Sequence, residues 1–430
     1  MIDLINLAPA LEVALLGAVL ALLAAGGVMW RARRAGLSGW PAWQHALTVA
    51  TLFLTIDLVV FGAFTRLTDS GLGCPDWPGC YGQTSPWAAH AQIAAEQAAV
   101  PHGPVTHSKA WIEMTHRYLA TGVGALITGL MVAGWWLRDR RGSLSPWWAT
   151  ATFVWVCAQG AFGALTVTLK LQPIIVTLHL LGALLGVGLL TAQVRVLEGV
   201  RSPPPEHGLG APAYFNAWAS APLRRWGWLV LTLVSVQVAL GGWVSTNYAV
   251  LVCSDIPTCQ GQWWPDMDFA NGFHLLRALG ENGQGEPISM AALTAIHMSH
   301  RLMALVIVVA LWRYGAALRT WRPEAHAVAT EAQAHAPSES TVAASEVTPP
   351  WRREGLWLWG LLAWQVLSGL SNVVLGWPLA AALAHTLGAT LLVWRLVRLL
   401  VLPRLVHEPV GVRPPAPQGL HPGAARVSTS

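Results

Sequence analysis

Nine apolar runs divide the sequence, and short polar segments separate them. The runs cover approximately residues 8–30, 43–64, 112–137, 147–168, 174–197, 226–246, 292–316, 354–376 and 379–401. About 20 residues of helix, rising roughly 1.5 Å per residue, are enough to cross about 30 Å of hydrocarbon. The pattern therefore predicts an all-α fold and a polytopic membrane protein in which each run is one transmembrane helix.

Composition supports a membrane protein and excludes one that binds nucleic acid. Hydrophobic residues make up 54% of the chain and charged residues only 11%, whereas ordinary soluble domains carry about 25% charged residues. Many of the 25 tryptophans lie near the ends of the apolar runs, where their amphipathic rings suit the membrane interface. The formal charge of +5 comes from dispersed arginines, which membrane topology explains without a nucleic acid.

Basic residues collect in alternate connections between the runs. The connections that follow the first, third, fifth, seventh and ninth runs are rich in arginine, and the others carry little beyond Arg66, Lys109, Lys170 and Arg277. The positive-inside rule places the arginine-rich set in the cytoplasm. The N-terminus and the remaining connections are therefore expected on the outer side.

A short cysteine motif occurs twice and marks a duplication. Both copies read C-x-D-x-P-x-C, at Cys74–Cys80 and at Cys253–Cys259. Each copy is followed by a His-Arg pair on an apolar run, and then by a glutamine 20 residues before a second histidine. These residues are His116, Arg117, Gln159 and His179 in the first half and His300, Arg301, Gln365 and His385 in the second. Four helices per unit make the halves parallel repeats related by an axis along the membrane normal.

The duplication and the linkers predict five segments. Residues 1–42 form an extra N-terminal helix and a basic loop, 43–197 the first four-helix half, 198–224 a cytoplasmic linker, 225–401 the second four-helix half, and 402–430 a tail. The tail and an insert at 323–350, which is rich in Ala, Ser, Glu and Pro, have compositions typical of disorder. Disordered cytoplasmic segments are therefore expected in both places.

The two cysteine pairs, Cys74–Cys80 and Cys253–Cys259, are expected to form disulfides. The space outside a bacterial inner membrane is oxidising, and cysteines six residues apart around a proline turn can come within disulfide range. A structural link that fixes each loop and a redox-active pair both remain open. The fifth cysteine, Cys157, lies alone in an apolar run and is interpreted as a packing residue.

Four histidines at equivalent places in two repeats indicate a cofactor site in each half. Ionisable residues inside a membrane are costly and mark functional sites. In each half the histidines lie on the second and fourth helices, so two imidazoles can face one another as they do around a haem in a four-helix bundle. A zinc site would need further Cys, His or carboxylate ligands, and none recurs at that depth in both halves.

Polar residues near these histidines have more than one interpretation. Arg117 and Arg301 could bind haem propionates with their fork of donors or extend to lipid headgroups. Gln159 and Gln365 could bond an imidazole, a propionate or a neighbouring helix. These alternatives stay open at the level of sequence.

The halves differ beside the first histidine of each. Glu113 precedes His116 by three residues, where the second half has His297, and Arg66 of the first half has no counterpart. Glu113 could serve as a general acid or base, or it could be a residue that the helix dipole favours near an N-terminus. His297 could be an alternative ligand to His300, because residues three apart share a helix face. The asymmetry suggests that one half reacts and the other carries electrons or gives support.

The chain resembles the haem A synthase family in five motifs. They are Phe61–Leu72, Glu113–Arg117, Leu178-His179, His300-Arg301 and His385, within about residues 43–401. The resemblance implies an enzyme that oxidises the C8 methyl of haem O to a formyl group, giving haem A for haem-copper terminal oxidases. It implies His116 and His179 as ligands of the substrate haem O and Glu113 as a catalytic carboxylate. It implies His300 and His385 as ligands of a haem b cofactor, with Arg66, Arg117, Arg301, Gln159 and Gln365 as propionate-binding or supporting residues.

The resemblance also implies a location and partners. We expect a multi-pass protein of the bacterial inner membrane with its cysteine loops on the periplasmic side. A haem O synthase and an electron donor are the expected partners, and terminal oxidase assembly factors, membrane lipid and further copies of the chain are additional candidates. The alternative function is a bis-histidine dihaem electron-transfer protein, which needs the same four histidines but not the asymmetry at Glu113 and Arg66.

Overall fold

The computed structural model describes residues 8–139, 143–201, 221–320 and 350–401, and helices dominate all four ranges. The long helices are α1 (Ala8–Arg34), α2 (Trp40–Leu67), α4 (His107–Trp136), α5 (Pro146–Thr168), α6 (Pro173–Arg201), α8 (Ala221–Thr246), α10 (Met290–Thr320), α12 (Pro350–Val374) and α13 (Leu379–Leu400). Three short helices lie in loops: α3 (His90–Ala99), η1 (Ala249–Leu251) and α9 (Phe269–Gly272). Each predicted apolar run corresponds to one long helix, which confirms the all-α fold class.

Eight of the described helices are long and apolar enough to cross a membrane. The predicted ninth span, α12, is 25 residues long but is not apolar enough to be counted with them. Its first turns are charged and its length carries several tryptophans, whose indole N–H lowers the mean hydropathy. The structure therefore confirms a multi-pass membrane protein, and for α12 only the length supports the predicted span.

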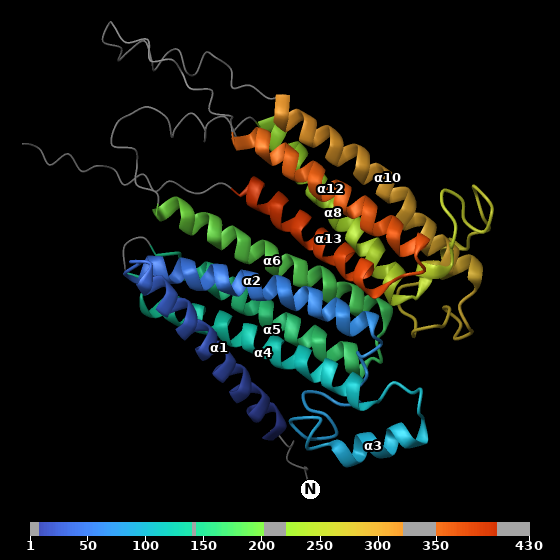
Figure 1. Ribbon diagram of the computed structural model, residues 1–430, viewed down its shortest axis with the longest axis horizontal. Coiled ribbons are helices and arrows are strands. Elements are labelled where there is room, and N and C mark those ends of the chain that lie inside the picture. The colour runs from blue at the N-terminus through green and yellow to red at the C-terminus, as the bar shows by residue number, and fades with distance from the viewer. Residues whose placement is uncertain (1–7, 140–142, 202–220, 321–349, 402–430) are drawn as a thin grey trace, which may run out of the picture.

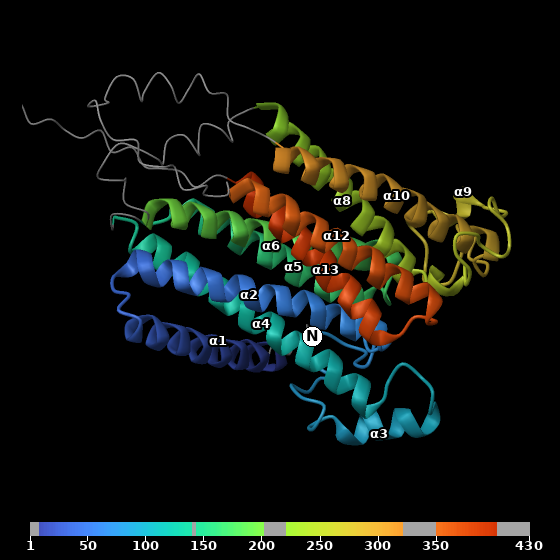
Figure 2. The same ribbon diagram turned by 45° about the horizontal axis from the view of Figure 1, so that its top comes forward.

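The long helices form two rings of four. In the first ring α2, α4, α5 and α6 contact one another in cyclic order, and α8, α10, α12 and α13 do so in the second (Figure 1). Helix α1 stands outside both rings and packs against α4 and α2, on the side away from α8 and α10 (Figure 2). Each ring thus contains one copy of the repeated motif, and α1 is the additional helix.

The main hydrophobic core lies where the rings meet. Helix α6 contacts α8 and α13, and α2 also contacts α13. The fully buried members of this core are Val187, Leu190, Val230, Leu311, Tyr314, Leu318, Leu358 and Leu396. An ion-pair network closes the same interface, because Glu198 of α6 accepts from Arg195 at 2.5 Å and from Arg398 of α13 at 2.9 Å. Side-chain packing and this network hold the rings together.

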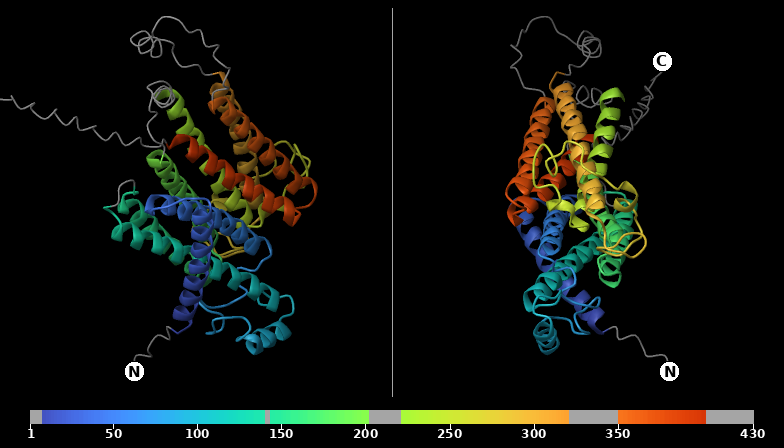
Figure 3. Two further views of the ribbon diagram at one scale, coloured as in Figure 1. Left: turned by 60° about the vertical axis from the view of Figure 1, so that its left-hand side comes forward. Right: turned by 90° about the vertical axis from the view of Figure 1, so that its right-hand side faces the viewer.

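The cysteine loops and the helices α3, α9 and η1 gather at one end of the molecule, which we call the loop end (Figures 1 and 3). Both predicted disulfides form there, with Cα separations of 4.9 Å for Cys74–Cys80 and 4.6 Å for Cys253–Cys259. Helix α4 also begins at this end, where the Thr106 hydroxyl accepts from the backbone N–H of Lys109 at 3.3 Å. Such an N-cap satisfies one of the free donors of the first turn.

The structure changes two predictions about particular segments. The prediction that Cys157 is packed is wrong, because its side chain is exposed on α5. Both ends of the predicted linker 198–224 are helical, since α6 continues to Arg201 and α8 begins at Ala221. The remainder of that linker, the insert from 323 to 349 and the tail 402–430 lie outside the described residues.

The glycines of α1 test how this extra helix docks on α4. A Cβ added at Gly17 would lie 2.8 Å from the backbone carbonyl carbon of Thr121, whereas one added at Gly26 would meet nothing within 4 Å. We expect Gly17→Ala to lower the free energy of unfolding by about 1–3 kcal/mol through overpacking. Gly26→Ala should be neutral or slightly stabilising because alanine favours helix. Thermal unfolding of both variants in detergent measures the difference, and equal midpoints would contradict this docking.

Candidate functional site

The four repeated histidines lie in the loop-end halves of α4, α6, α10 and α13, and a glycine of a neighbouring helix faces each ring. The pairs, with the distance from an ideal glycine Cβ to the histidine Cε1, are Gly62 and His116 (3.1 Å), Gly163 and His179 (3.6 Å), Gly241 and His300 (3.0 Å), and Gly369 and His385 (3.2 Å). Each imidazole therefore rests directly against the backbone of the adjacent helix. A side chain at the glycine position would meet the ring.

The spacing of these glycines repeats, and it is a signal that sequence reasoning missed. Gly163 and Gly369 each precede their histidine by 16 residues, and Gly62 and Gly241 each precede the first motif cysteine by 12. Glycine at these four places lets the imidazoles approach a helix axis closely, as small residues do in membrane helix contacts. The ligand candidates and their contact surfaces were thus duplicated together.

The structure brings the histidines together in pairs, one pair in each ring. His116 on α4 and His179 on α6 lie on opposite helices of the first ring, and His300 on α10 and His385 on α13 lie on opposite helices of the second. All four histidines are half-buried as residues. The second and fourth helices of each ring supply the pair, as predicted.

The imidazole Nδ1 atoms differ between the rings. In the second ring the Nδ1 of His385 lies 3.0 Å from the Ser368 hydroxyl, and that of His300 lies 3.1 Å from the amide nitrogen of Gln237. In the first ring the Nδ1 atoms of His116 and His179 are buried and have no hydrogen-bond partner among the described residues. Buried ring nitrogens without a partner are uncommon, and they distinguish the first ring from the second.

The residues present fit a haem in each ring. Iron in a porphyrin needs only one or two axial ligands from the protein, and paired imidazoles supply them. The described residues include no group of three or more His, Cys, Asp or Glu side chains that could hold a bare metal ion. The four histidines, their glycine contacts and their pairing therefore suit a macrocycle better than a zinc-type site.

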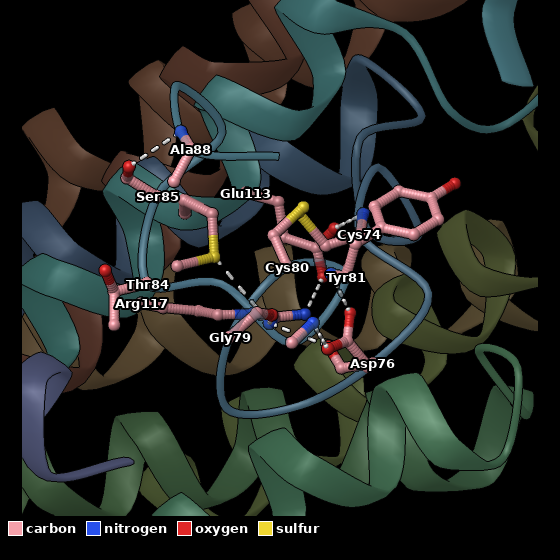
Figure 4. Close-up of a disulfide and its surroundings, with 12 residues drawn as sticks. Cys74, Asp76, Gly79, Cys80, Tyr81, Thr84, Ser85, Ala88, Glu113 and Arg117 are labelled. Carbon is pink, nitrogen blue, oxygen red and sulfur yellow. Dashed lines mark hydrogen bonds and ion pairs between the residues drawn. A yellow bond between two sulfur atoms is a disulfide. The ribbon is translucent and has the colours of Figure 1, made fainter. Parts of the chain in front are cut away.

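Glu113 is buried and faces the first cysteine loop. Its Oε2 accepts from the backbone N–H of Cys74 at 2.7 Å, and its Oε1 accepts from Nη2 of Arg117 at 2.5 Å (Figure 4). Only 4% of its surface is exposed. The carboxylate predicted to be catalytic thus lies three residues from His116 and also links α4 to the disulfide loop.

Arg117 and Arg301 bind the cysteine loops in equivalent ways. Arg117 Nη1 donates to the carbonyls of Asp76 at 2.8 Å and Gly79 at 2.5 Å (Figure 4). Arg301 donates to the carbonyls of Cys253, Asp255 and Thr258, each at 2.9 Å. A planar guanidinium presents several fixed donors at once, which is why arginine can gather the carbonyls of a tight loop. These are the contacts of supporting residues.

The aspartates of the repeated motif cap the turn that follows each second cysteine. Asp76 accepts from the N–H groups of Tyr81 at 2.6 Å and Gly82 at 2.7 Å. Asp255 accepts from Gln260 at 2.8 Å and Gly261 at 3.0 Å. The aspartate, the disulfide and the arginine thus fix each loop from three directions.

His297 is the second-ring equivalent of Glu113, and like Glu113 it contacts the backbone of the loop end. It is buried, and its Nδ1 lies 2.7 Å from the carbonyl oxygen of Ala249 in η1. This loop contact accounts for the extra histidine. Both rings therefore use the residue three positions before the histidine to hold the loop end.

Arg66 connects the two rings. Its Nη2 donates to the carbonyl of Ser245 at 2.5 Å, and its guanidinium lies 4.1 Å from the centre of the Tyr248 ring. The Tyr248 hydroxyl in turn donates to Asp69, which also pairs with Arg66 at 3.3 Å. The contact is asymmetric: the first half supplies the arginine, and the second half supplies the Ser245 carbonyl and the Tyr248 ring. The second half therefore has no equivalent arginine.

The repeated glutamines lie between helices. Gln365 donates to the backbone carbonyl of His385 at 2.9 Å. Gln365 lies against Gly388, and Gln159 lies against Gly182 in the same relation. Of the alternatives for these residues, the structure shows contact with a neighbouring helix and, for Gln365, support of the histidine backbone.

Comparison with known proteins shows which family the chain belongs to. The family model described as "Cytochrome oxidase assembly protein" matches residues 45–397. The chain belongs to this family. The match begins within α2 and ends within α13, so it includes both rings and leaves α1 outside. Membership confirms the resemblance that the sequence motifs indicated.

Relatives within the family share most of the chain. A protein named Heme A synthase from Shewanella oneidensis is 33% identical over 348 residues, which is 81% of this chain and 92% of the relative. Heme A synthases from Rhizorhabdus wittichii and Methylobacterium radiotolerans are 27% and 29% identical, and they match 80% and 77% of this chain and 89% and 82% of their own lengths. The residues matched by the family model, 45–397, include both histidine pairs.

The glycine beneath His385 provides a test of the ligand geometry. A Cβ at Gly369 would lie 3.2 Å from the ring, whereas one at Gly360 of the same helix would meet nothing within 4 Å. We expect Gly369→Ala to displace the imidazole and lower haem retention by about tenfold, as disturbed ligand surroundings do. Gly360→Ala is the control. The haem content of both purified variants is measured by absorbance, and equal content would contradict a ligand role for His385.

The second cysteine loop should lose order in acid. A hydrogen bond from the Thr258 hydroxyl, and then one from the Gly261 N–H, hold the pKa of the Asp255 carboxyl below its usual value of 3.8. A depressed pKa means that this stabilisation is present above 3.8 and is lost as the pH falls through the lower folded-state value. Hydrogen-exchange protection of Gln260 and Gly261 should fall in that range.

Substitution tests at neutral pH whether the Asp255 carboxylate fixes this turn. Asp255→Ala should remove the protection of the Gln260 and Gly261 amides, whereas Asp266→Ala, at an exposed position of the same loop, should leave it unchanged. Protection that survives both acid and Asp255→Ala would show that the carboxylate does not fix this turn.

Proposed function

We propose that this chain is a haem A synthase, a membrane enzyme that converts haem O to haem A. One observation carries the proposal: two pairs of histidines on opposite helices, one pair in each ring, occur in a chain that is 33% identical to a Heme A synthase over 81% of its length. The reaction oxidises the C8 methyl of the macrocycle to a formyl group by successive hydroxylations. The dihaem electron-transfer alternative finds no support in the named relatives.

The two rings receive different roles in this proposal. His116 and His179 of the first ring bind the substrate haem O, and His300 and His385 of the second ring bind haem b. The haem b cofactor supplies one-electron chemistry when it is bound. The unpartnered Nδ1 atoms in the first ring and the partnered ones in the second support this division.

Glu113 is the acid–base residue of the proposal. Its carboxylate lies three residues before His116, is buried, and has both oxygens engaged by donors. A carboxylate in such a place can take up or release a proton beside the reacting methyl group. Glu113 also accepts a hydrogen bond from the Cys74 amide, so its substitution can disturb the loop as well as proton transfer. The activity of a Glu113 variant is therefore compared at equal bound haem.

The supporting residues keep the loop end closed over the site. Arg117 and Arg301 fix the two cysteine loops, and Arg66 joins the rings between them. We assign the disulfides a structural role, because each closes a loop that an arginine and an aspartate also hold. The proposal also assigns haem propionates as partners of these guanidinium groups, whose fork of donors suits carboxylates.

The proposed location is the bacterial inner membrane with the loop end in the periplasm, which the positive-inside pattern supports. A haem O synthase would supply the substrate, and an electron-transfer partner is needed because oxidation of a methyl group to a formyl group transfers electrons. Terminal oxidase assembly factors would receive the product. Lipid surrounds the exposed helix faces, and further copies of the chain are proposed as possible neighbours.

Haem analysis of cells that also express a haem O-making enzyme tests the proposal. Wild-type protein should give haem A, detected by extraction and chromatography. Glu113→Gln should lower the haem A yield by about 10²–10⁴-fold, the usual contribution of an acid–base group, while haem stays bound. Glu96→Gln, an exposed site on α3, is the control. Absence of haem A from the wild type would contradict the proposed function. Full activity of Glu113→Gln would contradict the acid–base role of Glu113.

A further inference from the structure

Ser368 determines which nitrogen of His385 carries the proton. The serine lies on α12 directly before Gly369, and its Oγ is 2.7 Å from the carbonyl oxygen of Trp364 and 3.0 Å from Nδ1 of His385. A hydroxyl has one proton to donate, and a carbonyl oxygen can only accept. The Ser368 proton therefore goes to Trp364, and Oγ accepts from an N–H at Nδ1 of His385.

This arrangement leaves Nε2 of His385 with a free lone pair. A neutral imidazole carries its proton on one nitrogen only, and the hydrogen bond at that nitrogen selects the tautomer. A partner at the N–H also fixes the ring orientation and makes the other nitrogen more basic, which strengthens a bond to metal. Ser368 thus prepares His385 to bind iron through Nε2.

The first ring has no such arrangement. Gly163 and Gly369 each lie 16 residues before their histidine, so the residue equivalent to Ser368 is Phe162. Phenylalanine has no group that can accept from an imidazole, and Nδ1 of His179 has no partner among the described residues.

The other histidine of each ring also has different neighbours in the two rings. Gln237 lies four residues before Gly241, and its amide nitrogen, which can only donate, lies 3.1 Å from Nδ1 and 3.4 Å from Nε2 of His300. The equivalent residue, four before Gly62, is Leu58, and Nδ1 of His116 also lacks a partner. Nδ1 of each second-ring histidine thus has a polar side chain beside it, which donates at His300 and accepts at His385. Nδ1 of each first-ring histidine has no hydrogen-bond partner among the described residues.

We propose that Ser368 is a positioning residue that holds His385 in its iron-binding tautomer, and that the lack of equivalent partners in the first ring makes haem exchangeable there. This inference rests on the proposed function, because it takes haem as the ligand of both histidine pairs. A substrate must leave after reaction and a cofactor must stay, so the two sites need different retention. The hydrogen bond from Nδ1 of His385 to Ser368 provides that difference.

Haem transfer to excess apomyoglobin tests the proposal on purified, haem-loaded protein. Wild type should lose haem in two phases, a fast one from the first ring and a slow one from the second. Ser368→Ala should speed the slow phase by about 10–100-fold, the usual effect of losing an outer partner of a ligand. It should also raise the midpoint potential of the second haem, because a less electron-rich imidazole stabilises ferric iron less well.

Two further variants separate positioning from general damage. Ser371→Ala is the matched control, since the side chain of this α12 serine bonds the backbone carbonyl of Leu367 and no histidine among the described residues, and it should behave as wild type. Ser368→Thr keeps a hydroxyl and should restore slow loss and the wild-type potential. An unchanged slow phase and potential in Ser368→Ala would overturn the inference alone, whereas wild-type protein that binds no haem would overturn the proposed function with it.

Discussion

The contact between an imidazole and the backbone of a neighbouring helix is the constraint on which the rest of the structure depends. A histidine inside a membrane bundle is costly unless the bundle gives it a defined place. Here each ring rests on a glycine, at Gly62, Gly163, Gly241 and Gly369. Only the absence of a side chain lets the helices approach closely enough to hold the ring. Two such contacts in each helix ring hold the two imidazoles of a pair in fixed positions.

The loop end is built around the same helices and therefore responds to the same geometry. Arg117 and Arg301 directly follow the first histidine of each pair and gather loop carbonyls. Glu113 and His297, three residues before those histidines, bond the backbone of the first loop and of η1. The histidine, the arginine that follows it and the residue three positions before it thus lie on one side of the helix, within about one turn. Displacement of that turn would move the ligand candidate and the loop together.

The sequence predicted the parts of the account that depend on pattern. Alternating arginine-rich connections and nine apolar runs were sufficient for the helices, and the duplicated C-x-D-x-P-x-C motif was sufficient for both disulfides. Pattern could not show that Arg66 joins the rings, because its partner Tyr248 is 182 positions further along the chain. It could not show the aspartate caps or the tautomer set by Ser368, because these depend on where single atoms lie. The exposed Cys157 was missed because an apolar run in a membrane has a lipid face as well as a packed one.

The central claim is that each ring holds its own iron between two imidazoles. Low-temperature electron paramagnetic resonance of the oxidised protein, purified from cells that make haem O, tests it most directly. The account predicts low-spin signals of bis-histidine iron from two sites, with His300→Ala abolishing one and His116→Ala the other. A single signal, or one that survives both substitutions, would contradict it.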